Sequence, residues 1–178
     1  MSERRVNARH DRERADWILA AVERHELDLL RYVASITGRA ETAREVVQDT
    51  FLRLCQQSPG DLDGRMAEWL FTVARNRALD VKRKERRMST LTAEQTAGCL
   101  DNREAPQSSA ETADDLQRVE RLVASLSDNQ QEVLRLKFQS GLSYKQIAAV
   151  TGLSVSNVGY LLHTAVRSIR DSLMPDDA

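Results

Sequence analysis

Residues 142–162, which read LSYKQIAAVTGLSVSNVGYLL, restrict the local fold more than any other segment of the chain. Ser143 followed by Gln146 forms the S-x-x-Q pattern of a capping box, which predicts that a helix begins there. Gly152 tolerates a positive φ, and Ser154 is a favourable N-cap for a second helix. Two helices joined by so short a turn predict a helix-turn-helix.

The apolar residues of this segment are spaced as two crossing helices require. Ala148 is small enough for the two backbones to approach closely. Ile147, Val158 and Leu161 would fill the wedge between the helices. An unrelated helical hairpin, in which the glycine at position 152 serves only as a C-cap, is the alternative.

The polar face of the second helix is the predicted DNA-binding surface, because such a face enters the major groove. Lys145, Arg167 and Arg170 are the only charged residues between positions 143 and 170, a modest positive charge that supports phosphate contact. A single histidine such as His163 is typical of a surface or interface residue rather than of a metal ligand. The residues on this face are Ser156, Tyr160, His163 and Arg167.

The composition favours an all-α protein. Only 7 Gly and 3 Pro occur in 178 residues, so strand and turn signals are scarce while helix formers abound. The chain has neither an apolar signal segment nor a run of about 18 apolar residues, and we expect a cytoplasmic protein. Cys55 and Cys99 have no Cys or His at ligand spacing, so we predict no metal and no cofactor, and a buried Cys55.

Charge is distributed unevenly, although the net charge of the chain is only −1. Residues 65–87 carry eight Lys or Arg against three acidic residues, whereas residues 89–115 carry six acidic residues against one Arg. The acidic stretch has no sustained apolar period, which is typical of a linker. The predicted organisation is a flexible extension at 1–12, a helical domain at 13–88, a linker at 89–112 and a second helical domain at 113–174.

A helix predicted over residues 65–87 has a polar face that suits single-stranded nucleic acid. At 100° per residue, Trp69 falls on this face and is predicted to point away from the core, where an indole would stack on an unpaired base. Two alternatives stay open: Trp69 packs under a neighbouring helix or loop, or Asp80 pairs within the helix with Arg83 or Lys84. The predicted single-strand contacts are Trp69, Asn76, Asp80, Arg83 and Arg87.

Helices are also predicted over residues 13–37 and 41–57, which follow a 3.6-residue apolar period. The outward stripe of the second of these helices is polar except for Leu52. One exposed leucine usually carries no function. Set among Gln and Asp, however, Leu52 would be able to anchor a partner helix.

Three segments together resemble the sigma factors of bacterial RNA polymerase, specifically the short two-domain extracytoplasmic-function type. The segment AREVVQDTFLRLCQQ resembles the helix that binds core polymerase, and EWLFTVARNRALDVKRKERR resembles the helix that melts the promoter and recognises its minus-ten element. The segment LSDNQQEVLRLKFQSGLSYKQIAAVTGLSVSNV resembles the minus-thirty-five-binding domain. The resemblance covers residues 20–87 and 113–172. It implies a promoter-specificity subunit, with core RNA polymerase, promoter DNA and an anti-sigma factor as partners.

The resemblance also implies roles for particular residues. The loop at 58–65 would hold a flipped non-template base, the acidic linker would lie in the RNA path of the polymerase, and Asn157 would join the minus-thirty-five contacts. The residues implied to dock on the coiled coil of the largest polymerase subunit are Gln48, Asp49, Leu52 and Arg53.

The chain departs from the family at two positions of the second DNA-binding helix. Gly159 and Leu161 stand where members often carry Lys or Arg, so we expect weaker independent binding to the upstream element. The alternative function is a stand-alone helix-turn-helix regulator of duplex DNA, which would not need the basic helix at 65–87. An enzyme is not indicated, because Gly-rich phosphate loops and the H-E-x-x-H and G-x-S-x-G motifs are absent from the sequence.

Overall fold

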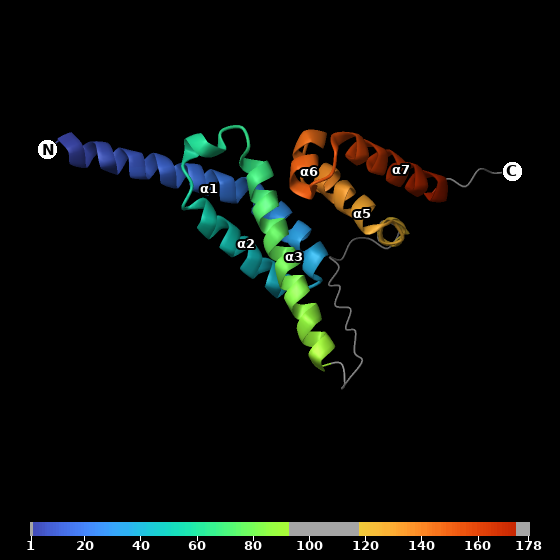
Figure 1. Ribbon diagram of the computed structural model, residues 1–178. Coiled ribbons are helices and arrows are strands. Elements are labelled where there is room, and N and C mark those ends of the chain that lie inside the picture. Colours follow the sequence, from blue (N-terminus) through green and yellow to red (C-terminus); the bar gives the residue numbers. More distant parts are fainter. Residues whose placement is uncertain (1, 93–117, 174–178) are drawn as a thin grey trace, which may run out of the picture.

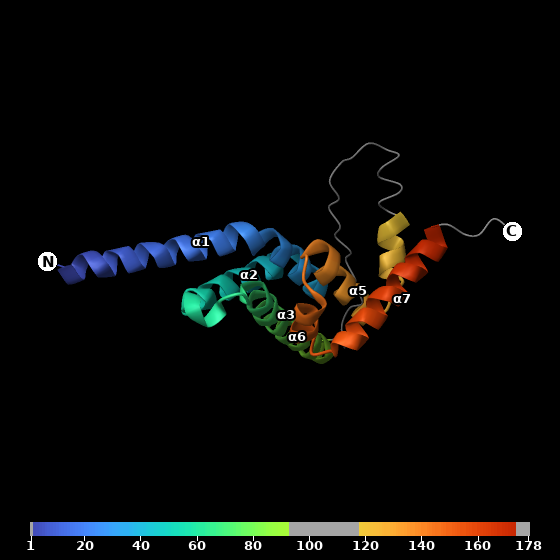
Figure 2. The same cartoon turned by 90° about the horizontal axis from the view of Figure 1, so that it is seen from above.

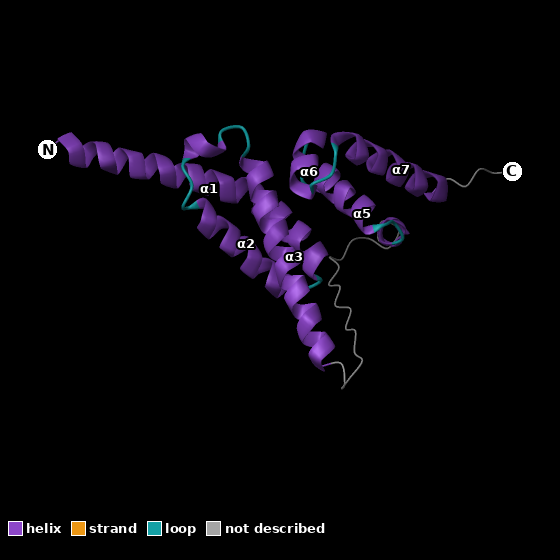
Figure 3. Cartoon of the chain, viewed as in Figure 1, coloured by secondary structure: helices purple, strands orange, loops and turns teal. Residues whose placement is uncertain are grey.

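The computed structural model describes residues 2–92 and 118–173, and every regular element in these ranges is helical (Figure 1; Figure 3). The first group comprises α1 (Ser2–Thr37), α2 (Ala40–Leu54), the 3-10 helix η1 (Pro59–Leu62) and α3 (Met66–Thr92). The second comprises a helix at 118–124, α5 (Asp128–Leu134), the π-helical turn η2 (Arg135–Gln139), α6 (Tyr144–Thr151) and α7 (Val155–Leu173). The predicted all-α fold with two helical domains is confirmed. Most of the predicted linker, from residue 93 on, lies outside the described residues.

The core of the first domain lies where α1, α2 and α3 meet, and Figure 2 shows α2 and α3 beneath α1. The rings of Tyr32 and Phe71 pack at 5.5 Å between centroids, at the contact of α1 with α3. Burying one large apolar side chain contributes about 1.5–3 kcal/mol, so this seam is what holds the three helices together. The buried residues of the seam include Leu29, Tyr32 and Val33 of α1, Val46, Val47 and Leu54 of α2, and Leu70, Phe71, Ala74 and Ala78 of α3.

Three helix boundaries differ from the prediction. Helix α1 begins at Ser2, so the segment predicted as a flexible extension is helical, and α3 continues to Thr92. Helix α2 ends at Leu54 rather than 57, because Gln56 and Gln57 donate to carbonyls three residues back and tighten the chain before the Ser-Pro break. The predicted burial of Cys55 is therefore wrong: its side chain is exposed at the end of α2.

The helix-turn-helix forms as its sequence predicts. Ser143 and Gln146 make the reciprocal bonds of a capping box at the start of α6. Gly152 adopts a left-handed conformation with a φ of 76° and donates its N–H to the carbonyl of Ala148 at 2.9 Å. The Ser154 hydroxyl accepts from the backbone N–H of Asn157 at 3.2 Å. These local contacts fix the angle between α6 and α7, and with it the face that α7 presents.

The two domains contact each other directly. Helix α3 packs against α6 (Figure 1; Figure 2). Helix α1 also touches η2. The second domain has its own core beneath this contact, formed by Val133, Leu136, Leu142, Ile147, Val158 and Ala165. None of the described helices is long and apolar enough to cross a membrane.

Two Gly→Ala substitutions in this motif are expected to act in opposite directions. Gly152→Ala forces an L-residue into a left-handed conformation and should lower the free energy of unfolding by about 1–2 kcal/mol. Gly159 lies inside α7, and an added Cβ would meet Tyr144 Cε2 at an ordinary 3.7 Å. Gly159→Ala should therefore raise stability by up to about 1 kcal/mol. Urea unfolding followed by circular dichroism measures both changes, and shifts of the same sign would contradict this account of the turn.

Candidate nucleic-acid interface

One outward stripe of α3 carries most of the residues predicted to contact single-stranded DNA. Asn76, Asp80, Arg83 and Arg87 recur at intervals of four, three and four residues, and all four side chains are exposed. Asp80 accepts a hydrogen bond from Arg83 at 3.1 Å. The intrahelical pair that was the alternative interpretation of Asp80 is therefore present. Because both partners are exposed, the pair contributes little to stability and can exchange for a phosphate contact.

Trp69 does not point freely into solvent, which corrects the prediction from the helical wheel. Its side chain is half-buried and packs against the core cluster. The wheel treats α3 alone, whereas the chain between α2 and α3 folds back over this position and η1 is anchored there by buried Leu62. The open alternative, a tryptophan beneath a neighbouring loop, is the better description.

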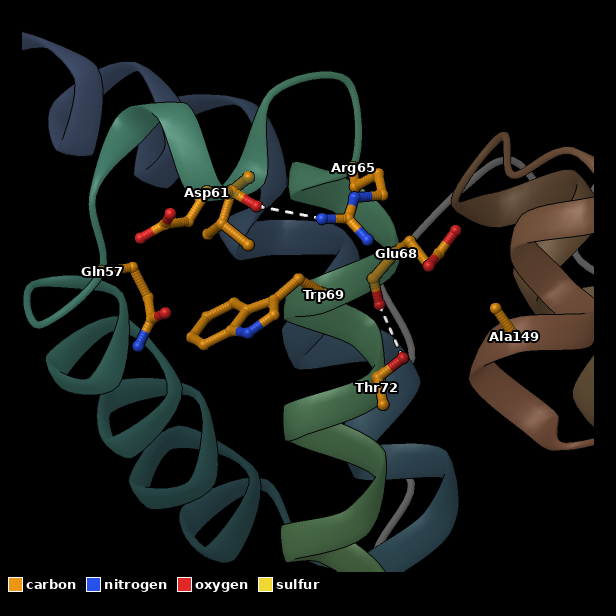
Figure 4. A pocket seen from close by; sticks show the side chains of 8 residues that line it. Gln57, Asp61, Arg65, Glu68, Trp69, Thr72 and Ala149 are labelled. Atoms are coloured by element: carbon orange, nitrogen blue, oxygen red, sulfur yellow. Dashed lines mark hydrogen bonds between the residues drawn. The ribbon is translucent and has the colours of Figure 1, made fainter.

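The indole forms one wall of a cavity of about 390 Å³ (Figure 4). Arg65 crosses its upper side and donates to the carbonyl of Asp61 at 3.1 Å, while Thr72 donates to the carbonyl of Glu68 at 2.7 Å. An aromatic wall beside amide, carboxylate and guanidinium groups suits stacking and hydrogen bonding to an extruded base. Gln57 and Glu68 were not predicted from the sequence, since nothing local indicates that they line the same cavity as Trp69. The lining residues are Gln57, Asp61, Leu62, Arg65, Glu68, Trp69, Thr72 and, from α6, Ala149.

The stripe of α2 predicted to bind polymerase is exposed around its one apolar residue. The Leu52 residue is 57% exposed, and Gln48 and Arg53 beside it are exposed as well. Asp49 is half-buried, and its carboxylate forms an ion pair with Arg77 of α3 at 3.3 Å. The stripe therefore combines an apolar centre with a polar rim, of which one carboxylate is already paired.

The outward face of α7 presents all of its predicted DNA contacts to solvent. Tyr160 is 66% exposed, and Arg167 carries an exposed ion pair with Asp171 at 3.5 Å. Gly159 lies next to the ring of Tyr144, over which Lys137 places its ammonium at 5.6 Å from the ring centroid. The exposed residues of the predicted duplex surface are Lys145 on α6 and Ser156, Asn157, Tyr160, His163 and Arg167 on α7.

A polar cluster that no sequence pattern predicts lies at the domain contact. The hydroxyl of Tyr32 donates to Glu132 Oε1 at 2.7 Å, and Arg75 donates to both oxygens of the same carboxylate at 2.7 and 3.0 Å. Burial, and then the charge of Glu132, raise the pKa of Tyr32 far above its usual range, so the phenol remains a donor. The hydrogen bonds to Glu132 raise the pKa of Arg75, while burial lowers that of neighbouring Arg135. Tyr32 and Arg75 are 100 and 57 residues away from Glu132 in the sequence, so no local pattern could have indicated this cluster.

No metal site is found in the described ranges, 2–92 and 118–173, where no three His, Cys, Asp or Glu side chains converge as ligands. What the described surfaces offer is cations, aromatic rings and hydrogen-bonding groups on helix faces. These are the means by which proteins bind nucleic acid and other proteins.

Comparison with known proteins gives matches to both domains. Residues 21–88 match the family described as "Sigma-70 region 2", and residues 116–169 match "Sigma-70, region 4". The "ECF RNA polymerase sigma factor SigL" of Mycobacterium tuberculosis is 34% identical over 162 residues, which cover 86% of this chain and 87% of that protein. The "ECF RNA polymerase sigma factor SigM" of Bacillus subtilis is 27% identical and covers 80% of this chain and 86% of its own length.

Two solved structures share the fold. The sigma factor RpoE of Bartonella quintana, in complex with the anti-sigma factor NepR, superposes with a TM-score of 0.62 at 22% identity. The superposition covers 92% of this chain and 98% of that one. CnrH, in complex with the cytosolic domain of CnrY, superposes with a TM-score of 0.58 at 24% identity and covers 90% and 89% of the two chains.

A cation at position 159 is expected to strengthen binding of the full-length chain to duplex DNA. Gly159→Arg has room for its Cβ and adds a charge to the α7 face, so the affinity should rise at low salt. The slope of log affinity against log salt should steepen by about 0.9 for one additional phosphate contact. Fluorescence anisotropy across a salt series measures this, with Gly159→Ala as the uncharged control. An unchanged slope would show that α7 does not face the backbone at this position.

Proposed function

This chain belongs to the extracytoplasmic-function type of the sigma-70 family and is an RNA polymerase sigma factor, and we propose how its surfaces divide the work of transcription initiation. The observation that carries the proposal is the presence of both family regions in one chain, region 2 before region 4. It disfavours the alternative of a stand-alone regulator, which would need only the helix-turn-helix. We place the first domain at 13–88 and the second at 113–174, joined by the acidic linker.

The proposed polymerase-binding surface is the α2 stripe of Gln48, Asp49, Leu52 and Arg53. Leu52 is the centre of this surface, because an exposed apolar side chain gains most when a partner covers it, and a polar rim then excludes water. Asp49 would exchange part of its contact with Arg77 for a polymerase group.

The proposed single-strand surface runs along α3 into the Trp69 cavity. Arg83 and Arg87 would hold phosphates, and Asn76 and Asp80 would contact sugar or base edges. The half-buried indole would stack on one extruded base, a contact worth about 1–3 kcal/mol. A preformed cavity suits this role better than a freely exposed ring, because the indole is already held in place before the strand arrives.

The proposed duplex surface is the exposed face of α7 with Lys145 of α6. Ser156, Asn157, Tyr160 and His163 would contact base edges in the minus-thirty-five element, and Arg167 would exchange Asp171 for a phosphate. Few cations line this face, so duplex binding would depend on the first domain and on polymerase.

We further propose that the protein acts in the cytoplasm, performs no catalysis of its own and binds an anti-sigma factor. The ground for the anti-sigma partner is the similarity to RpoE, which was solved in complex with one. The linker would follow the RNA path of the polymerase, as the resemblance implies.

Run-off transcription tests the function as a whole. With purified core polymerase and a genomic fragment library, the chain should produce transcripts with defined start sites that core polymerase alone does not produce. Binding of defined duplex sites by the chain alone, with no effect on polymerase, would instead establish the stand-alone regulator.

Separate substitutions of Asp49 and Arg77, which form one ion pair, distinguish a role of Asp49 in binding polymerase from a structural role. Asp49→Asn and Arg77→Gln each break the same exposed pair, so each should change stability by no more than about 1 kcal/mol. Only Asp49→Asn should weaken binding to core polymerase, by about tenfold or about 1.4 kcal/mol. Biolayer interferometry without DNA measures this, and equal losses for the two variants would remove Asp49 from the polymerase surface.

A further inference from the structure

Helix α1 carries charges of opposite sign on the two halves of one stripe. At 100° per residue, ten positions between 5 and 27 fall within an arc of about 120°. The charged residues among them are arginines up to position 12 and acids from position 16 on. We call these ten positions the α1 stripe: Arg5, Ala8, Arg9, Arg12, Asp16, Leu19, Ala20, Glu23, Glu26 and Leu27.

The α1 stripe lies on the side of α1 that is turned away from the rest of the first domain. The buried residues of α1, among them Leu29, Tyr32 and Val33, fall on the other side, against α2 and α3 (Figure 2). Leu19 and Leu27 of the stripe are 56% and 58% exposed. In the described ranges, 2–92 and 118–173, the exposed acids of the stripe form no ion pair. The second half of the stripe therefore offers apolar area and acidic groups to a partner.

The first half of α1 extends beyond the three-helix core as a single rod (Figure 1; Figure 2). Among residues 11–37 of α1, Ala21 is the first that is buried in the core. Most of the stability of a helix in a protein comes from packing of one of its faces. A partner that packs along this rod would therefore stabilise it.

A second copy of this chain is the partner whose charges match the α1 stripe. Turned antiparallel about a two-fold axis near position 15, it places its arginines at positions 5, 9 and 12 within about one turn of Glu26, Glu23 and Asp16. The axis makes the contact reciprocal, so each of these pairs occurs twice. A parallel pair would set like charges against like. The stripe is therefore self-complementary in the antiparallel orientation.

We propose that the free protein forms a two-fold symmetric dimer in which the α1 stripes of two copies pack antiparallel. Leu19 covers the aliphatic stem of Arg12 of the second copy, and Ala20 lets the two helices approach closely. The ion pairs fix orientation and register more than they add stability. The stripe faces away from α2 and α3, so the surfaces proposed for polymerase and single-stranded DNA take no part in this contact. The inference does not depend on the proposed function.

Sedimentation velocity of the full-length protein tests the dimer without polymerase or DNA. At low salt, the weight-average mass should rise from that of one chain toward that of two as the protein concentration increases. About 0.5 M salt should return the mass to that of one chain, because exposed ion pairs are screened. Wild type that remains a monomer at every concentration in low salt would overturn the proposal.

Charge reversal tests which residues of the two copies face each other. Arg9→Glu and Glu23→Arg each set like charges against each other twice, so each should raise the dissociation constant of the dimer about tenfold. An equimolar mixture of the two variants should regain the wild-type affinity, because every altered pair is again of opposite sign, and so should the double variant.

Arg24→Glu is the matched control, since this exposed arginine lies on α1 outside the stripe. It should leave the dissociation constant unchanged. A loss as large as that of Arg9→Glu, or two single variants that fail to restore each other, would overturn the proposed register.

Single-cysteine variants test the antiparallel orientation. In a chain with Cys55→Ser and Cys99→Ser, Asp16→Cys lies beside the two-fold axis, and mild oxidation should link two copies through it. Leu27→Cys should not form a disulfide, because its counterpart lies about 36 Å away along the helices at 1.5 Å per residue. Equal yields at the two positions would indicate a parallel pair and contradict the proposal.

Discussion

Helix α3 packs against α1 and α2, contacts the second domain and leaves one side in solvent. The rest of the structure depends on how its faces are divided among these three environments. One face buries Leu70, Phe71 and Ala74 against α1 and α2. A second carries Arg75 to the domain contact, and a third leaves the stripe from Asn76 to Arg87 in solvent. The core contact, the domain contact and the polar stripe therefore occupy different sides of one helix.

Local signals in the sequence were sufficient for the helix-turn-helix. Ser143, Gln146, Gly152 and Ser154 act within a few residues of themselves, and their structural contacts are the ones that their spacing predicts. Helical periodicity likewise predicted that Leu52 is exposed, because only one side of α2 faces solvent. The helices, their caps and their polar faces could therefore be predicted from the sequence.

Long-range contacts could not be predicted from the sequence. The wheel put Trp69 on the polar side of α3, yet η1 folds over that side and makes it the wall of a cavity. Glu132 looked like any charged residue of a short helix, since its partners Tyr32 and Arg75 come from another domain. In both cases the missing information is the placement of one element on another, which the period of a single helix does not contain.

Exposed ion pairs explain how a chain of net charge −1 can present basic surfaces to DNA without adhering to DNA everywhere. Arg77, Arg83 and Arg167 each hold an acidic neighbour in the free chain. Such pairs contribute at most about 1 kcal/mol, so phosphates at the right positions can displace them, whereas a poorly placed phosphate gains little. The contact of Glu132 with Arg75 differs in being largely covered, so removing either partner would leave a desolvated charge unpaired.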